Sequence, residues 1–258
     1  MVQRDAQHTG AISSGPPTPL KRGWKAESGH PDGSDTTWPV IKRGVVYATS
    51  GPGVIAVQGA TGRRLWWRES AEGSKQIGLA VDDQALYVPL PFGKLAALDL
   101  ATGSELWKVD TGETGLEDAS PVLLEGRLFF GLPEAKTISA YNLADGSVAW
   151  SVRNEFEPDS VPAAADGTVV LSTQALDSVR AIFLALESSS GREVWRVQNQ
   201  IGNSSPSIFD GKVIFGGGDR FAYALDLKTG RRIWRSPTED VFSPRNMPAI
   251  AFGDVFLA

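Results

Sequence analysis

The sequence predicts an all-β fold built from repeats, because one short pattern recurs five times along its 258 residues. Each copy reads as a strand, a tight turn and a second strand that carries a tryptophan. An alanine lies six residues before the turn glycine and the tryptophan four residues after it, without exception. The tryptophans are 41, 43, 45 and 39 residues apart, a spacing that indicates a repeat architecture. The five sets are Ala56, Gly62 and Trp66; Ala97, Gly103 and Trp107; Ala140, Gly146 and Trp150; Ala185, Gly191 and Trp195; and Ala224, Gly230 and Trp234.

A second set of columns precedes these motifs and predicts a hairpin at the start of every repeat. A proline opens the hairpin, with Leu79 in its place in the second repeat, and a turn residue follows five positions later. Asp166-Gly167 and Asp210-Gly211 are strong hairpin signals. Proline suits the start of a strand, where the ladder needs no N–H. The prolines are Pro39, Pro121, Pro162, Pro206 and Pro248, and the turn residues are Gly44, Gln84, Gly126, Gly167, Gly211 and Gly253.

The two patterns together predict four short antiparallel strands in each repeat, which is the blade of a β-propeller. No stretch has a convincing apolar period of about 3.6 residues, so we expect almost no helix. The chain holds five full repeats and the start of a sixth at residues 247–258. We therefore expect an N-terminal arm over residues 1–20 and a single, incomplete propeller over residues 21–258.

The motif residues have predicted structural roles. A tryptophan can fill the gap of about 10 Å between facing sheets while its N–H reaches a carbonyl. The alanine leaves room for the neighbouring indole, and the turn glycine supplies a positive φ. Trp107, Trp150 and Trp195 stand between repeats that are both present, so we expect them to be buried. Trp24 falls in the tryptophan column, and Trp67 should be more exposed because it faces the other side of its strand.

Composition disfavours several kinds of function. The net charge of −5 argues against nucleic acid as a partner, because phosphate binding needs a basic surface. The chain has no cysteine, which excludes disulfides and thiolate metal sites. Its apolar runs are far shorter than the roughly 18 residues of a membrane span. The first residues lack the apolar core of a signal peptide, so we expect neither a membrane span nor an export signal in this stretch.

No residue pattern nominates an active site, and we predict no catalytic, cofactor-binding or metal-binding residue. His8 and His30 have no further ligand at a suitable spacing. The segment 32–35 lacks the glutamate that would close a calcium loop. The segment Gly216-Gly217-Gly218-Asp219 follows a predicted strand, but no helix comes after it, so we interpret it as a turn rather than a phosphate-binding loop.

A cation follows the tryptophan in every repeat. Charges on the outermost strand of a blade block edge-to-edge pairing with other sheets, and we favour this role over a basic recognition stripe. The cations are Lys25, Arg68, Lys108, Arg153, Arg196 and Arg235.

The stretches Ala97 to Trp107 and Ala224 to Trp234 both read Ala-Leu-Asp-x-x-Thr-Gly-x-x-x-Trp, and they resemble the tryptophan-docking motif of PQQ-like propellers. That family includes quinoprotein alcohol dehydrogenases, the BamB lipoprotein of outer-membrane assembly, and propeller domains of bacterial envelope proteins and kinases. Gln58, Asn142 and Glu187 replace the motif aspartate but keep a polar turn residue. The resemblance implies a ring of seven or eight blades, of which this chain is a fragment, and an exported or envelope-associated parent protein.

We expect a non-catalytic, BamB-like scaffold that binds a protein partner or an envelope polymer through its face loops, in the periplasm or cell envelope. One alternative is the sensor or interaction propeller of a larger bacterial protein such as a Ser/Thr kinase. The other is a degenerate PQQ-dependent quinoprotein dehydrogenase. The resemblance would then require a catalytic Asp, a Ca²⁺ site and a vicinal Cys pair, and the chain has no Cys. We therefore expect no cofactor.

Overall fold

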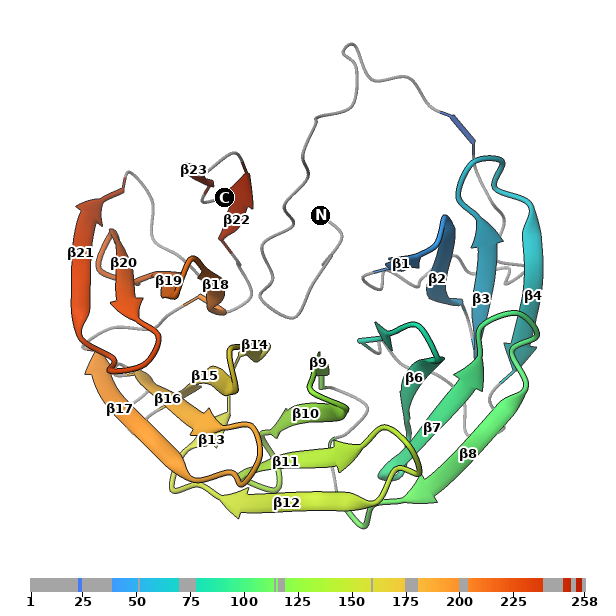
Figure 1. Ribbon diagram of the computed structural model, residues 1–258, viewed down its shortest axis with the longest axis horizontal. Helices are drawn as coiled ribbons and strands as arrows, with labels where there is room; N and C mark the ends of the chain where they lie inside the picture. The colour runs from blue at the N-terminus through green and yellow to red at the C-terminus, as the bar shows by residue number, and fades with distance from the viewer. Residues whose placement is uncertain are drawn as a thin grey trace. The chain divides into compact units, whose positions relative to one another are not determined.

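The computed structural model describes residues 23–24, 39–50, 52–69, 78–113, 115, 119–158, 160–174, 181–199, 204–238, 248–251 and 254–256. Every regular element in these ranges is a β-strand (Figure 1), so the prediction of an all-β chain is confirmed. The strands fall into two compact units, which we describe in turn.

The first compact unit contains two four-stranded antiparallel sheets and the turn at residues 143–147. In both sheets the strands follow one another in chain order. One sheet consists of β1 (Val40–Lys42), β2 (Val45–Ser50), β3 (Gly53–Gln58) and β4 (Arg64–Glu69). The other consists of β5 (Ala80–Val81), β6 (Ala85–Leu90), β7 (Lys94–Asp99) and β8 (Glu105–Asp110).

The second compact unit contains the remaining sheets, all antiparallel. The first has β9 (Val122–Leu124), β10 (Arg127–Leu132), β11 (Thr137–Asn142) and β12 (Val148–Arg153). The next has β13 (Glu157–Pro158), β14 (Ala163–Ala165), β15 (Thr168–Gln174), β16 (Ala181–Glu187) and β17 (Glu193–Asn199). Then come β18 (Ser207–Phe209), β19 (Lys212–Gly216), β20 (Phe221–Asp226) and β21 (Arg232–Pro237), followed by the hairpin of β22 (Ala249–Ala251) and β23 (Asp254–Phe256).

The predicted opening hairpins are confirmed. The strands β1, β9, β14, β18 and β22 each begin directly after the column proline, and β5 begins after Leu79. In four of the hairpins both turn residues have positive φ, the geometry whose twist matches that of the flanking strands. The φ angles are 48° and 73° at Asp166-Gly167 and 48° and 65° at Asp210-Gly211. Local turn chemistry therefore determines where these repeats start.

The sheet of β13 to β17 has one strand more than predicted. β14 pairs with residues 168–170 of β15, and β13 pairs with residues 173–174 of the same strand. β13 thus continues the sheet edge beyond the end of the short strand β14. The sequence did not predict β13 for two reasons. Its pairing depends on a return of the chain to this sheet edge, and a strand of two residues is too short to show a periodic pattern.

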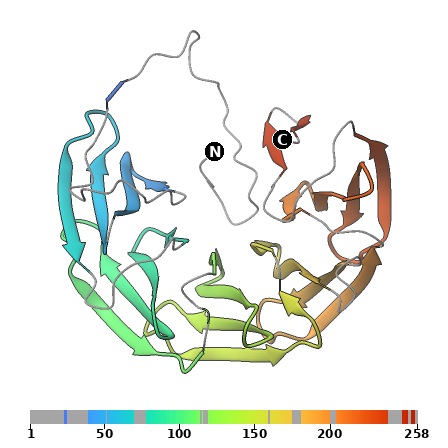
Figure 2. The ribbon, with the colours of Figure 1, turned by 180° about the vertical axis from the view of Figure 1, so that it is seen from behind.

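The four-stranded antiparallel sheet is the blade of a β-propeller, and the predicted fold class is confirmed (Figure 2). The start of a sixth repeat is present as the hairpin of β22 and β23. The predicted arm, residues 1–20, lies outside the described residues. The division into an arm and one domain over residues 21–258 stays a prediction.

Apolar side chains of neighbouring sheets form shared cores. In the second compact unit, one core joins β16 to β19 through Phe183 and Phe215, whose ring centroids are 3.9 Å apart. In the first compact unit, another core joins the two sheets through Tyr47, Trp66 and Leu86. The inner strands are therefore buried on both faces, as in β6, whose six residues are all buried.

The adjacent residues Trp66 and Trp67 in β4 test the strand register. Trp66 is 9% exposed and Trp67 is 39% exposed, which confirms the predicted difference. Trp66→Ala should lower the free energy of unfolding by about 3–5 kcal/mol, the usual cost of removing a large core aromatic. Trp67→Ala should cost less than about 1 kcal/mol. Urea unfolding measures both, and equal losses would show that the register of β4 is wrong.

Candidate functional site

The tryptophan of each repeat is bound to a turn of the following repeat by one hydrogen bond. Its indole N–H donates to the backbone carbonyl three residues before the turn glycine, at 2.8–3.0 Å in four motif pairs. Trp24 makes the equivalent bond to Gly59 at 2.6 Å, so it belongs to the tryptophan column as predicted. The four pairs are Trp66–Leu100, Trp107–Leu143, Trp150–Ser188 and Trp195–Leu227.

The turn glycine receives the ring of the same tryptophan. A Cβ atom on Gly103 would lie 2.7 Å from the Trp66 ring, and one on Gly230 would lie 2.7 Å from the Trp195 ring. The φ angles of the five motif glycines are 67–73°, a range that favours glycine. Glycine is therefore required for the turn and also for the close approach of the indole. The sequence analysis predicted only the first of these roles.

The motif alanines lie opposite the tryptophan of their own repeat. In the strand register Ala97 pairs with Trp107, and Ala185 pairs with Trp195. A register shift follows directly after each of the five alanines, and all five are 0% exposed. The alanine therefore makes room for the indole of its own sheet. That it also leaves room for the neighbouring indole, which docks on the glycine turn, stays a prediction.

The docked tryptophans differ in burial. Trp195 is buried, as predicted, at 8% exposure. Trp107 and Trp150 are only partly buried, so the prediction of full burial is wrong for these two. All four of these tryptophans, Trp66 and Trp195 included, lie on the last strand of their sheets, so the strand position alone does not set the burial of the ring.

The motif aspartate organises the turn that receives the indole. Asp99 Oδ1 accepts hydrogen bonds from the Thr102 hydroxyl at 2.7 Å, the Thr102 N–H at 2.8 Å and the Ala101 N–H at 3.1 Å. The hydroxyl contributes most to lowering the pKa of Asp99. Where the sequence departs from the motif, Gln58 accepts from Thr61 and Glu187 accepts from Ser190. These departures keep a polar partner in the turn, as expected.

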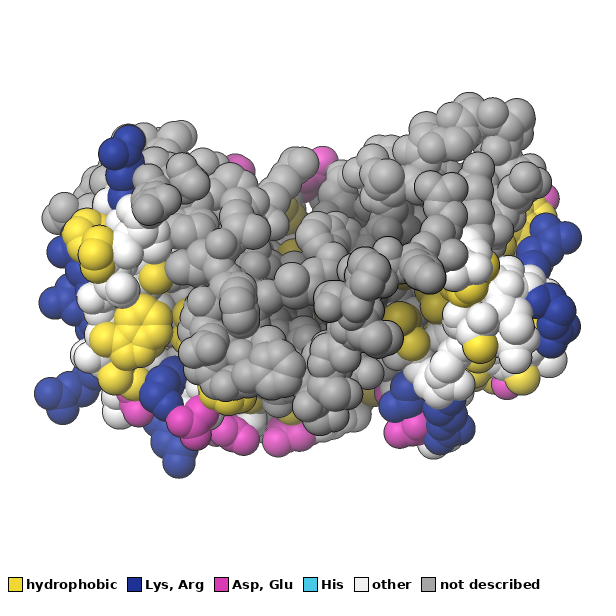
Figure 3. Space-filling model, turned by 90° about the horizontal axis from the view of Figure 1, so that it is seen from above, with side chains coloured by type: hydrophobic (Ala, Val, Ile, Leu, Met, Phe, Trp, Pro, Cys, Tyr) yellow, Lys and Arg dark blue, Asp and Glu magenta, His cyan; other side chains and the backbone are white. Residues whose placement is uncertain are grey.

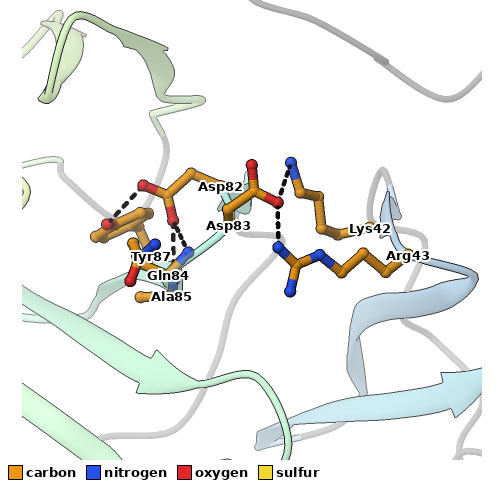
Figure 4. A network of polar contacts seen from close by, with 7 residues as sticks. All are labelled: Lys42, Arg43, Asp82, Asp83, Gln84, Ala85 and Tyr87. Atoms are coloured by element: carbon orange, nitrogen blue, oxygen red, sulfur yellow. Dashed lines mark hydrogen bonds and ion pairs between the residues drawn. The ribbon is translucent and has the colours of Figure 1, made fainter.

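Acidic residues in the turn between β5 and β6 join the two sheets of the first compact unit (Figure 4). Asp83 forms ion pairs of 3.0 Å with Lys42, the last residue of β1, and of 2.8 Å with Arg43 in the turn that follows. Asp82 accepts two backbone N–H groups of its own turn at 2.8 Å and the Tyr87 hydroxyl at 3.1 Å. The ion pairs are solvent-exposed and contribute little stability. The cluster has a structural role, and no sequence pattern had singled it out.

The glycine-rich segment before β20 forms a turn, as interpreted from the sequence. Asp219 in this turn accepts the Tyr223 hydroxyl and lies 3.4 Å from Arg235, whose guanidinium stacks 3.4 Å from the centroid of Phe221. Burial, and then the bond to Asp219, raise the pKa of Tyr223 to about 12. The other carboxylate oxygen of Asp219 is buried without a hydrogen-bond partner. A carboxylate at this place would repel phosphate.

Five of the cations after the tryptophans lie on the last strand of a sheet, which is an edge strand, and Lys25 lies outside the described residues. On the molecular surface, Lys and Arg side chains (dark blue) lie close to Asp and Glu side chains (magenta) (Figure 3). Arg196 pairs with Glu193 at 2.8 Å, and Lys108 with Glu105 at 3.7 Å, on their own strands. Charges of both signs along an exposed edge support protection against edge pairing rather than a basic recognition stripe.

A groove of about 590 Å³ lies beside Trp24 in the first compact unit. Ile41, Val46 and Leu65 supply its apolar wall, and Arg43 lies at its border. The Trp24 ring rests there on Gly62, as Trp66, Trp107, Trp150 and Trp195 rest on the next turn glycine. The groove therefore belongs to a tryptophan-docking surface and presents no reactive group.

The candidate metal ligands of the sequence analysis, His8, His30 and segment 32–35, lie outside the described residues. Among the described ranges, no three His, Asp or Glu side chains come together as a metal cluster would require. No helix in the same ranges has the length and apolarity of a membrane span.

The two ends of the strands differ in their connections. The turns between the third and fourth strands have a constant length of five residues, whereas the loops between the second and third strands vary from two to six. The constant turns are residues 59–63, 100–104, 143–147, 188–192 and 227–231. The variable loops are residues 51–52, 91–93, 133–136, 175–180 and 217–220. The tryptophans dock on the turns of constant length, and these turns lie at the opposite strand end from the variable loops.

Four-stranded antiparallel blades joined by tryptophans that dock on the next turn define the PQQ-like β-propellers. The family model described as outer membrane protein assembly factor BamB matches residues 21–108, 53–177 and 134–258. The chain belongs to this family.

Several characterised proteins are similar to parts of this chain. Tetrathionate hydrolase of Acidithiobacillus ferrooxidans is 25% identical over 202 residues, 70% of this chain and 40% of that protein. BamB of Yersinia pestis is 27% identical over 164 residues, 58% of this chain and 40% of that protein. The dehydrogenase subunit of a quinone alcohol dehydrogenase from Gluconacetobacter polyoxogenes is 25% identical over 253 residues, 83% of this chain and 34% of that protein. The chain thus spans well under half the length of these relatives.

The fold is also that of solved structures. The crystal structure of BamB from Moraxella catarrhalis has a TM-score of 0.56 at 17% identity, covering 87% of this chain and 80% of that one. A likeness at this identity shows the fold alone.

The docking of tryptophan on glycine can be tested with two glycines that have the same φ angle. Gly126 and Gly191 both have φ of 73°, but a Cβ on Gly191 would lie 2.7 Å from the Trp150 ring, whereas one on Gly126 would meet nothing within 4 Å. Gly126→Ala should cost about 1–2 kcal/mol of unfolding free energy from backbone strain. Gly191→Ala should cost about 1–3 kcal/mol more, because the ring must move. Equal costs in chemical unfolding would contradict the second role of the glycine.

Proposed function

We propose that this chain is part of a non-catalytic, BamB-like scaffold of the bacterial envelope, which binds a protein partner through the variable loops of its blades. The observation that carries the proposal is the difference between the two strand ends. The constant turns are occupied by docked tryptophans, which leaves the variable loops for contact with other molecules. A rigid framework that carries variable loops is a common design for recognition surfaces.

The relatives support an envelope role. The BamB proteins among them are described as assembly factors for outer membrane proteins. By analogy, the partner of this chain is a protein of the outer membrane assembly machinery, and the parent protein acts outside the cytoplasm. An envelope polymer as the bound component remains the second possibility of the same proposal.

A second candidate function is that of a quinoprotein dehydrogenase, favoured by the similarity to quinone-dependent alcohol dehydrogenases. The residues of the described ranges do not fit a PQQ and Ca²⁺ centre. Asp83 pairs with two cations, Asp219 binds Tyr223 and Arg235, and Asp99 is engaged in its own turn. The chain also has no cysteine to form the vicinal pair. We therefore derive no reaction step for this chain.

The loop-binding proposal predicts which exposed charges matter in the cell. Removing the gene should lower the amount of β-barrel proteins in the outer membrane. Reversing the exposed charges of the variable loops, with Glu134→Lys and Arg220→Glu together, should prevent the protein from restoring that amount. The control reverses two exposed charges on the constant turns, with Arg63→Glu and Lys228→Glu, and should restore it fully even though its net charge changes more. Quantitative blotting of outer-membrane fractions measures both, and equal restoration would reject binding through the loops.

The dehydrogenase candidate predicts a different result. We expect no saturable micromolar binding when PQQ is titrated in the presence of Ca²⁺, followed by PQQ absorbance and tryptophan fluorescence. Alcohol-dependent dye reduction should also stay at background. Saturable binding together with dye reduction would replace the scaffold proposal by the enzymatic one.

A further inference from the structure

Phe92 is the most exposed large apolar side chain among the described residues, at 77%. It lies in the loop at residues 91–93 between β6 and β7, one of the variable loops. Its neighbours Pro91 and Gly93 are both buried, so the ring projects from a covered support. A single exposed apolar residue is common on protein surfaces. The backbone of Phe92 is what sets it apart.

The backbone of Phe92 is in the left-handed region, with φ of 61°. This conformation is unfavourable for a bulky side chain. Within the described ranges, every other non-glycine residue with positive φ is charged and gains hydration at its position. Those residues are Arg43, Glu125, Lys136, Asp166, Asp210 and Arg220. Phe92 gains neither hydration nor burial, so folding does not explain an aromatic residue there.

The loop that carries Phe92 is held in place by the chain segment after β8. The Gly93 carbonyl accepts the Thr111 N–H at 2.8 Å and the Thr111 hydroxyl at 2.6 Å. A Cβ on Gly93 would lie 2.2 Å from the Glu113 carbonyl oxygen, which shows how closely the two segments pack. Asp110 in turn accepts the Gly112 N–H at 2.9 Å. The aromatic ring is thus presented on a preformed support, which reduces the entropy lost on binding.

We propose that Phe92 is an anchor residue that inserts into an apolar pocket on the surface of a folded protein partner. This inference rests on the proposed function and names the contact through which the loops bind. Aromatic residues are enriched at the centres of protein interfaces, where a polar rim surrounds them. Lys94, Asp110 and Glu113 provide polar groups beside the loop.

A membrane surface fits the same residue less well. Lipid binding by one aromatic ring needs support from cations that attract anionic headgroups. The neighbours of Phe92 include Asp110 and Glu113, and the whole chain has a net charge of −5. These charges favour a protein partner.

The test combines photo-crosslinking with competition. Phe92 is replaced by p-benzoylphenylalanine in the full chain, and crosslinking is carried out in envelope fractions of the bacterium that makes the protein. Unlabelled wild-type chain should suppress the adduct. Phe92→Ala chain should be about thirtyfold weaker as a competitor, the loss expected for an interface hot spot. The matched control, Leu106→Ala, removes a side chain that is 54% exposed on β8 and should compete within about twofold of wild type.

If Phe92 served the fold instead of binding, replacing it with alanine would lower the Tm. Because Phe92 is exposed and alanine keeps the Cβ atom that is strained at this φ, Phe92→Ala should leave the Tm unchanged. A lower Tm together with weaker competition would assign Phe92 to folding and overturn the proposal.

Further outcomes separate this inference from the proposed function. If crosslinkers at Glu134 or Arg220 capture a competable partner but Phe92→Ala competes as well as wild type, the anchor is rejected while loop binding stands. If no loop position gives a competable adduct, the proposed function fails as well. Sedimentation with vesicles of phosphatidylethanolamine and phosphatidylglycerol tests the membrane, and binding that is lost in Phe92→Ala would replace the protein partner by lipid.

Discussion

The hydrogen bond from an indole N–H to a turn carbonyl, with the ring resting on a glycine, is the constraint on which the rest of this structure depends. It fixes the turn length at five residues, because the carbonyl and the glycine must both face the ring. It also requires the alanine opposite each tryptophan, since the indole has to cross its own strand pair without a clash. The turn length, the glycine and the alanine thus follow from one contact.

This constraint leaves the other strand end free to vary. The loops there carry residues that the repeat pattern does not require. Examples are Phe92, with its left-handed backbone, and Asp219, which pairs with Arg235. A difference between a fixed end and a variable end is what a binding scaffold needs. It separates the residues that maintain the fold from those that recognise a partner, so that each set can change without disturbing the other.

The sequence predicted the strands and turns because their determinants are local. Asp166-Gly167 specifies its own hairpin, and the spacing of Gly103 and Trp107 is the same in every repeat. Contacts between distant segments left no such signal, as in the pairing of Asp83 with Lys42. The strain at Phe92 was also hidden, because it depends on how Gly93 packs against residues some twenty positions later. Sequence reasoning therefore gave the scaffold, and the candidate binding residue required the structure.

The docking contact also has an evolutionary consequence. The receiving turn offers the tryptophan a backbone carbonyl and a glycine, so the docking contact itself needs no particular side chain in that turn. Duplication, loss or exchange of whole repeats would therefore conserve this contact at each new junction. Recombination could change the number of blades in such genes, and only the shared apolar cores and ion pairs around the contact would have to adapt.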